Sequence, residues 1–215
     1  MRVLVACEYS GAVRDAFIAQ GHEAMSCDLL PTDAPNWTYD PLTRVRTHNP
    51  ERGGHYQGSV LDVLGYGWDL MIAHPPCTYL CSSGLHWNKR IPERAAKTQA
   101  AAEFVVKLWE ADIPRVCIEN PVGCLPRFIG PATQWIHPHQ FGHDASKKTG
   151  LWTRGLPALV GTEDIAPRII NGRPRWANQT DSGQNRLGPS ADRWKLRAKT
   201  YQGIASAMAN QWGTA

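Results

Sequence analysis

The stretch Trp68-Asp-Leu-Met-Ile-Ala-His-Pro-Pro-Cys-Thr-Tyr-Leu-Cys81 decides the fold. Its unbroken apolar run predicts a strand from Asp69 to Ala73 that is buried on both faces of a parallel sheet. Two successive prolines fix φ and remove two backbone donors, so the chain must leave the sheet at His74-Pro75-Pro76. We therefore expect Cys77 just past the carboxyl end of a central strand, where open α/β sheets place their ligands.

A cysteine at such a position is a candidate nucleophile, because a thiolate attacks soft electrophilic carbon. The alternative is a buried structural cysteine. A zinc site would need ligands from Cys77, Cys81 and the histidines, but the sequence contains no C-x2-C pair, and we expect no metal.

The composition describes an ordinary globular protein. The 215 residues fit one domain, alone or with a small appendage, with 42% hydrophobic and 20% charged residues. A net charge of +4 permits nucleic acid as a partner without requiring it. The six cysteines lack the spacing of a disulfide framework, and no apolar segment approaches membrane-spanning length. We expect a cytoplasmic protein with reduced thiols and no membrane contact.

The N-terminal part resembles half of a nucleotide-binding unit. A strand at Arg2–Ala6 is followed by a turn at Cys7–Gly11, a helix from Ala12 to Gln20 that Ser10 could cap, and a strand at Glu23–Asp28 that ends in an acid. Such an acid can bind ribose hydroxyls. Because the turn lacks G-x-G-x-x-G, we expect a nucleoside cofactor without a pyrophosphate.

The middle of the chain is less regular. Leu29 to Gly54 predicts a long irregular connection, and His55–Gly58 a short strand. Asp62 could accept from an exocyclic amine or cap a short helix, and the sequence leaves both open. Thr78 to Pro92 predicts a flexible polar loop that closes over a substrate.

Beyond this loop the pattern is clear again. Glu93–Trp109 predicts an amphipathic helix with Ala96, Ala100, Phe104, Val105 and Leu108 on one face. Arg115–Glu119 predicts another buried strand, so Glu119 and Cys77 should meet at one edge of the sheet. A glutamate there costs desolvation unless it has a partner or a function.

Pro75-Pro76-Cys77 and Glu119-Asn120-Pro121 resemble the Pro-Cys and Glu-Asn-Val signatures of DNA cytosine-5 methyltransferases. Ala6–Gly11 stands where the family's S-adenosylmethionine loop would be, and Thr200–Met208 is similar to the closing motif that returns to the cofactor pocket. The resemblance spans most of the chain, and the Pro-Pro-Cys and Glu-Asn pair is its specific part. It implies a short, phage-like member of the family, which would act in the host cytoplasm if phage-encoded.

The resemblance implies covalent chemistry. Cys77 adds to C6 of a cytosine while Glu119 hydrogen-bonds or protonates N3, so that C5 can attack the methyl sulfonium of S-adenosylmethionine. In a duplex the base must first be flipped out. The implied catalytic residues are Cys77, Glu119, Asn120 and Lys147. The implied cofactor-binding residues are Cys7, Glu8, Tyr9, Ser10, Gly11, Asp28, Asp62, Pro75 and Ser206.

The chain departs from the family in three respects: the residues around the Cys77 corner, the arginine-bearing motif and the target-recognition part. His74 stands where the family has glycine, and Thr78 where it commonly has glutamine. Gln140–Gly150 replaces the family's arginine-bearing motif, and there Lys147 or Lys148 either anchors the base carbonyl or a phosphate, or belongs to a solvated basic turn.

The third departure is the lack of a large target-recognition domain. We expect a catalytic core at 1–154, a small target-recognition segment at 155–195, and a C-terminal helix at 196–215 that returns to the core. The middle segment interleaves charged and aromatic residues, which suits phosphates and bases. A loop-rich subdomain with exposed arginines is the alternative. The charged and aromatic residues of this segment are Arg168, Arg173, Arg175, Arg186, Arg193, Trp176 and Trp194.

The predicted fold is a single doubly wound α/β domain, a Rossmann-like methyltransferase sheet with a small irregular C-terminal insertion. The predicted activity is methyl transfer from S-adenosylmethionine to C5 of cytosine, with DNA as the expected partner. Alternatives are a methyltransferase acting on RNA or free nucleotides, or an inactive methyltransferase fold that binds nucleic acid or protein. Transfer to an exocyclic nitrogen is disfavoured, because such enzymes place an aromatic residue where Cys77 stands.

Overall fold

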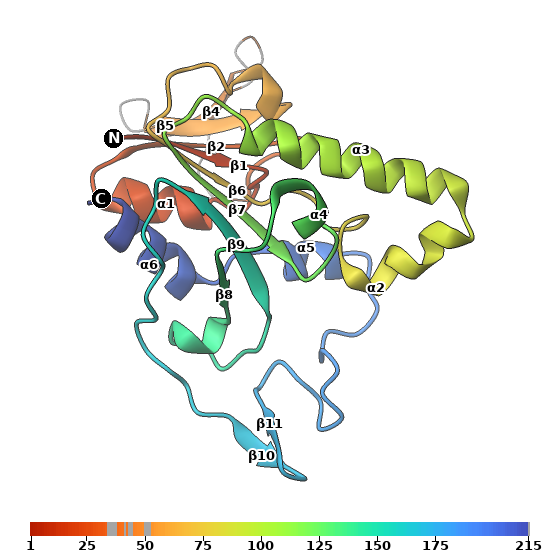
Figure 1. Cartoon of the computed structure of the whole chain (residues 1–215). Helices are drawn as coiled ribbons and strands as arrows, with labels where there is room; N and C mark the ends of the chain where they lie inside the picture. Colours follow the sequence, from red (N-terminus) through yellow and green to blue (C-terminus); the bar gives the residue numbers. More distant parts are fainter. Residues whose placement is uncertain (34–37, 41, 43–44, 50–52, 215) are drawn as a thin grey trace.

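The computed structural model describes residues 1–33, 38–40, 42, 45–49 and 53–214. Within these residues the chain forms a nine-stranded sheet of order β3-β4-β5-β2-β1-β6-β7-β9-β8 (Figure 1). Its five central strands are parallel: β1 (Arg2–Ala6), β2 (Glu23–Asp28), β5 (Gly53–Gln57), β6 (Leu70–Ala73) and β7 (Arg115–Pro121). Counted along the chain, they lie in the order 3-2-1-4-5 of a doubly wound Rossmann sheet. The predicted fold class is confirmed.

Antiparallel strands extend the sheet on both sides. At one edge β4 (Val45–Asn49) pairs with β5 and β3 (Thr38–Asp40) pairs with β4, so the predicted irregular connection from Leu29 to Gly54 is wrong in part. Positions 34–37, 41, 43–44 and 50–52 of that prediction lie outside the described residues. These strands are polar and short, as edge strands often are, and carry no alternating apolar pattern.

At the other edge the sequence pattern missed two strands. β9 (Thr149–Arg154) inserts between β7 and β8 (Gln134–Ile136), antiparallel to both.

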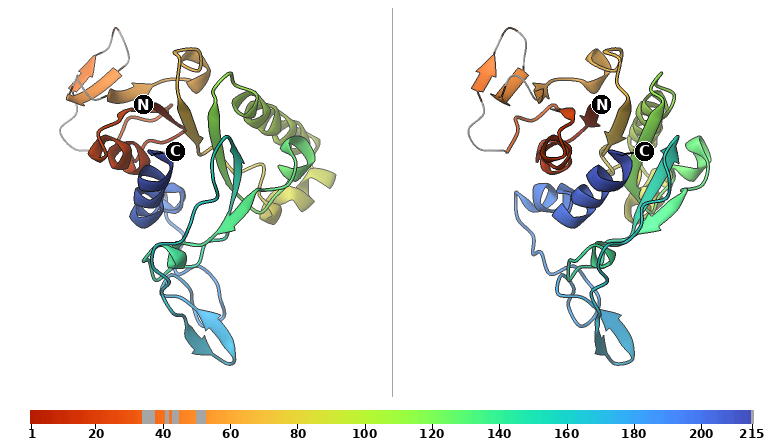
Figure 2. Two further views of the ribbon diagram at one scale, coloured as in Figure 1. Left: turned by 60° about the vertical axis from the view of Figure 1, so that its left-hand side comes forward. Right: turned by 90° about the vertical axis from the view of Figure 1, so that its left-hand side faces the viewer.

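Helices cover both faces of the sheet. α1 (Ala12–Ala19) and α6 (Gln202–Trp212) lie on one face and α3 (Pro92–Trp109) on the other (Figure 2). In β1, Val3 and Val5 pack toward α1 and α6, while Leu4 and Ala6 pack toward α3. Burial on both faces explains why the strands read as unbroken apolar runs.

The helix predicted at Glu93–Trp109 is confirmed, but the predicted apolar face is shifted. The structure buries Thr98, Ala102, Val105 and Leu108, whereas Ala96 and Ala100 are exposed. Alanine is small enough to lie on either face of a helix, so several alanines do not fix the phase of the pattern. Val105 and Leu108, the bulkier residues, were placed correctly.

Short elements complete the chain. The predicted loop Thr78–Pro92 instead contains α2 (Ser82–Leu85) and the 3-10 turn η2 (His86–Lys89); further short turns are η1 (Val60–Asp62), α4 (Pro126–Ile129) and η3 (Pro138–Gln140). The segment from 155 carries a hairpin of β10 (Arg168–Ile170) and β11 (Arg173–Arg175), which projects away from the sheet (Figure 1), and then α5 (Arg193–Ala198). No helix among the described residues is long and apolar enough to cross a membrane.

Candidate active site

The site is built at the carboxyl edge of the parallel strands. Cys27, Ala6, Ala73 and Ile118 are neighbours in register across β2, β1, β6 and β7. The residues that follow them are therefore the next row of the sheet, and they all carry chemical groups: Asp28, Cys7, His74 and Glu119. The order in which successive strands are added to the sheet reverses between β1 and β6. Open α/β sheets bind ligands at such a switch point.

The Pro-Pro corner is anchored to β7. The buried Asn120 donates from Nδ2 to the carbonyl of Pro75 over 2.9 Å. Pro75 is buried as well, while Cys77 after it is exposed. Asn120 thus positions the turn that delivers Cys77, and Pro75 is the residue through which this turn is held.

A second tie holds the chain beyond Cys77. Cys81 and Gly123 form a bridge, with the Cys124 N–H donating to the Leu80 carbonyl over 2.9 Å. A Cβ on Gly123 would collide with that carbonyl, so only glycine permits this close approach. The segments after Cys77 and after Glu119 are therefore fixed to each other.

Glu119 is held as a carboxylate. Its Oε2 accepts a hydrogen bond from Nδ1 of His74 at 2.7 Å, and both side chains are largely buried. Burial would raise the pKa of Glu119, but the charge of Lys147 and the hydrogen bond from His74 lower it to about 2.

Cys77 belongs to the same electrostatic cluster. Desolvation raises the pKa of its thiol, and Cys81 adds to this, whereas Lys147 lowers it. Burial thus favours the thiol form of Cys77, while the charge of Lys147 favours its thiolate, which is the nucleophilic form. All six cysteines are free.

The missed strand β9 explains how Lys147 reaches this cluster. Thr149 pairs with Pro121 in antiparallel register, so Lys147 lies just beyond the carboxyl end of β7. Lys148 instead lies over the Trp135 ring, 4.8 Å from its centroid. The structure therefore separates the two lysines that the sequence left as alternatives.

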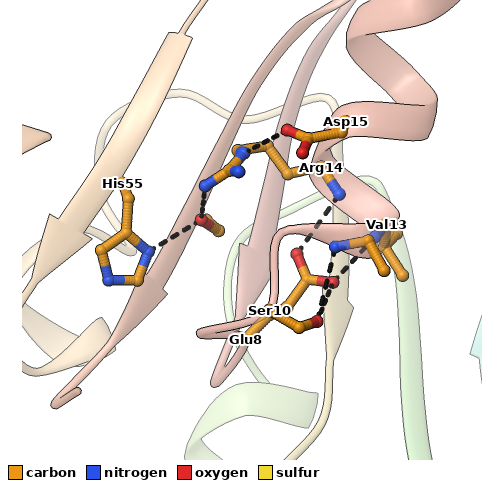
Figure 3. Close-up of polar contacts among 8 residues, drawn as sticks. Glu8, Ser10, Val13, Arg14, Asp15 and His55 are labelled. Atoms are coloured by element: carbon orange, nitrogen blue, oxygen red, sulfur yellow. Dashed lines mark hydrogen bonds and ion pairs between the residues drawn. The ribbon is translucent and has the colours of Figure 1, made fainter. Parts of the chain in front are cut away.

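Glu8 has a structural task in the N-terminal loop. Its carboxylate accepts hydrogen bonds from the backbone N–H groups of Val13 at 2.7 Å and Arg14 at 3.3 Å (Figure 3). Ser10, the predicted cap, accepts a hydrogen bond from the Ala12 N–H, but over a long distance of 3.4 Å. Glu8 thus occupies the N-terminus of α1, where a phosphate would otherwise bind.

A buried polar network fixes the start of α1 against the sheet. The Arg14 guanidinium donates to Ser26 over 2.8 Å, and Ser26 contacts His55 Nδ1 over 2.8 Å (Figure 3). Gly11 has φ 74°, and a Cβ there would collide with the Arg14 guanidinium. Glycine at position 11 is therefore needed for the turn, which leaves its predicted contact with a cofactor untested.

The other predicted cofactor residues gather beside this loop. Burial, with the charge of Asp28 as a smaller cause, raises the pKa of Cys7 to about 12. Burial also raises the pKa of the neighbouring Cys27, and the charges of Asp28 and Asp62 add to this. Burial raises the pKa of Asp28 itself. Asp62 is exposed and accepts from the Tyr56 hydroxyl at 3.1 Å, while Ser59 caps the turn η1. Asp62 is therefore not the cap.

The C-terminal segment returns to the same loop through α5. The Tyr9 hydroxyl donates to the Lys195 carbonyl over 2.7 Å, and Lys199 pairs with Asp33 at 2.9 Å. Ser206, by contrast, lies half-buried in α6 and accepts from Gln202 over 3.5 Å. The helix α6 packs on α1, while α5 contacts Tyr9.

Some of the expected nucleic-acid surface serves the subdomain itself. The indole of Trp176 stacks on His139 with centroids 4.4 Å apart, and Arg186 donates to the Gln179 carbonyl. Arg168 and Arg173 are exposed on the projecting hairpin, and Trp194 is 53% exposed. Arg168 also lies 4.0 Å from Asp181, and the Trp194 ring lies 6.5 Å from the ring of Tyr9.

His74 is the site residue that sequence reasoning did not select. It was visible as the residue before the Pro-Pro corner, one step past a predicted strand, in the same edge row as Glu119. No cluster of three or more metal-ligating side chains occurs among the described residues.

Comparison with known proteins gives limited information. No protein-family model matches the sequence, and no curated protein matches it. A similar solved structure is that of a candidate DNA modification methyltransferase encoded within an E. coli prophage, with TM-score 0.44 and 12% identity. The match covers 80% of this chain and 53% of that one, so this chain spans about half the length of that protein. The doubly wound fold follows from the strand order itself.

Proposed function

We propose that the protein is an S-adenosylmethionine-dependent methyltransferase that modifies C5 of cytosine in DNA through a covalent adduct at Cys77. The observation that carries the proposal is the cluster of Cys77, Glu119 and Lys147 at one edge of a doubly wound sheet, beside a nucleoside-type loop. A nucleophile, an N3 partner and a cation are the groups that addition to a pyrimidine requires.

The residues of the loop fit this cofactor better than a dinucleotide. Glu8 already fills the N-terminus of α1, so a pyrophosphate would meet a carboxylate there. Asp28 and Asp62 suit ribose and adenine, Tyr9 suits an aromatic contact, and the acidic surroundings suit a sulfonium cation. When bound, S-adenosylmethionine supplies an electrophilic methyl group.

The side chains divide the work as follows. Lys147 favours the thiolate of Cys77, which attacks C6. Glu119 binds the N3 side of the base, and Asn120 holds the corner that aims the thiolate. The hairpin β10–β11 contacts DNA outside the pocket, because a two-stranded ribbon fits a groove and exposed arginines bind phosphates.

The test is nucleoside mass spectrometry of DNA after incubation with S-adenosylmethionine that carries a deuterated methyl group. We expect labelled 5-methyldeoxycytidine with the wild type and with Cys81→Ser, and none with Cys77→Ala. Label at the exocyclic nitrogen, or unchanged label with Cys77→Ala, would contradict the mechanism. Label found only in RNA or in free nucleotides would mean that the substrate is RNA or a nucleotide rather than DNA. DNA binding that gives no label and does not depend on the cofactor would favour a binding module.

A further inference from the structure

His74 is fixed tightly between the two halves of the site. Its backbone N–H donates to the Ala6 carbonyl over 2.9 Å, which ties it to β1. Its side chain is 8% exposed, with Nδ1 at 2.7 Å from Oε2 of Glu119. The other ring nitrogen, Nε2, is buried without a hydrogen-bond partner among the described residues. Glu119 is therefore the group that orients the ring.

Charged groups on three elements act on this imidazole. Burial would lower the pKa of His74, but the hydrogen bond to Glu119 and the charges of Glu119 and Glu8 raise it, with Lys147 opposing. Glu119 belongs to β7, Glu8 to the loop after β1, and Lys147 to the chain before β9. The raised pKa of His74 and the lowered pKa of Glu119 both favour a charged pair in which the shared proton lies on the imidazole.

The proposed reaction needs a proton at this place. When a thiolate adds to C6, negative charge develops on the ring, and protonation of N3 neutralises it. Glu119 as a carboxylate has no proton to give. Glu8 is engaged with the amides of α1, so neither carboxylate can be the proton source.

We propose that His74 is a positioning residue that stores the proton which Glu119 delivers to N3 of the target pyrimidine. As the Sγ–C6 bond forms, one proton moves from Nδ1 of His74 to the Glu119 carboxylate, and one moves from the Glu119 carboxyl group to N3. His74 becomes neutral, and the adduct ring carries no net charge. When the Sγ–C6 bond breaks, the N3 proton returns by the same route. This inference rests on the proposed function and goes beyond it, since the resembling family has glycine here.

The test follows adduct formation as a function of pH. A 5-fluorocytosine oligonucleotide with S-adenosylmethionine traps the adduct, and its rate is measured for the wild type, His74→Gln and the control His22→Gln. His22 lies at the opposite end of β2, next to the N-terminus. General acid–base assistance contributes about 100-fold or more to a rate, so we expect the rate of adduct formation near pH 7.5 to fall by this order in His74→Gln. The decline of the rate at high pH should also begin at a lower pH in this variant than in the wild type. DNA binding should be unchanged.

A second measurement does not depend on turnover. In the NMR spectrum, we expect the pKa of His74 to be higher in the wild type than in Glu119→Gln, because the hydrogen bond to Glu119 and its charge raise it. If His74→Gln fails to fold, His74→Gly with added imidazole replaces it, and imidazole should restore the rate.

The outcomes separate the two proposals. No adduct from the wild type at any pH overturns the proposed function. A wild-type adduct with an unchanged rate and pH profile in His74→Gln, or a His74 titration that is the same in the wild type and Glu119→Gln, overturns the proton store alone.

Discussion

The His74–Glu119 pair should make the stability of the protein depend on pH in a defined window. The pKa of Glu119 is lowered from 4.5 to about 2 in the folded protein, against the effect of burial and through Lys147 and His74. A carboxyl group with a lowered pKa stabilises the fold above its unfolded pKa, and this contribution is lost as the pH falls toward the folded pKa. Each pH unit inside the window changes the free energy of unfolding by about 1.4 kcal/mol.

The expected loss from Glu119 between about pH 5 and about pH 3 is roughly 2 kcal/mol. The sign for His74 is opposite. Its pKa is raised, so its contribution is present below the unfolded pKa, about 6.5, and is lost as the pH rises through the folded value. The pair therefore stabilises the protein most between about pH 4.5 and about pH 6.5.

Urea unfolding of the wild type and Glu119→Gln across this range measures the effect. The difference in unfolding free energy between the two proteins should shrink by roughly 2 kcal/mol on going from about pH 5 to about pH 3. Glu103→Gln, which removes an exposed carboxylate of α3, is the matched control and should follow the wild type. A constant difference between wild type and Glu119→Gln would refute the lowered pKa and the arrangement of charges behind it.

Three further predictions concern neighbouring residues. Lys147→Ala should slow alkylation of Cys77 by iodoacetamide near neutral pH, because it removes the charge that lowers the thiol pKa, whereas Lys148→Ala should not; equal rates would contradict the placement of Lys147. Gly123→Ala should lower the free energy of unfolding by about 1–3 kcal/mol in urea titrations, because its Cβ meets the Leu80 carbonyl; an unchanged midpoint would show that the bridge can shift. Asn120→Ala should cost about 1–3 kcal/mol by the same measurement, because the Pro75 carbonyl loses its buried donor, and no loss would mean that the Pro-Pro corner holds its own shape.

The central part of the fold could be predicted from the sequence because its signals are local. Strands buried on both faces appear as unbroken apolar runs, so β1, β6 and β7 were found nearly to the residue. The edge strands β3 and β4 carry no such signal in the sequence, and the backbone pairing of β4 with β5 and of β3 with β4 defines them. The hairpin β10–β11 was missed although its turn, Asn171-Gly172, suits two positive φ angles. The arginines and the proline of its two short strands give no apolar or alternating pattern that would have indicated strands.

The candidate site was predictable to the extent that it lies at strand ends. Cys77 and Glu119 each follow a recognisable strand, and parallel strands bring their carboxyl ends to one edge. Lys147 depended on β9, a strand that the sequence did not reveal. The role of Glu8 at α1 is a local contact that the choice of Ser10 as the cap overlooked, whereas the contact of Tyr9 with α5 depends on tertiary packing, which no spacing rule predicts.

The most direct test of the central claim is the intact mass of the protein after incubation with S-adenosylmethionine and an oligonucleotide containing 5-fluorocytosine. Fluorine at C5 blocks the final elimination, so the adduct accumulates. We predict a complex with the mass of protein, DNA and one methyl group, mapped by peptide analysis to Cys77. Methylated product from ordinary DNA with no trapped complex, or a complex mapped to another cysteine, would contradict the account.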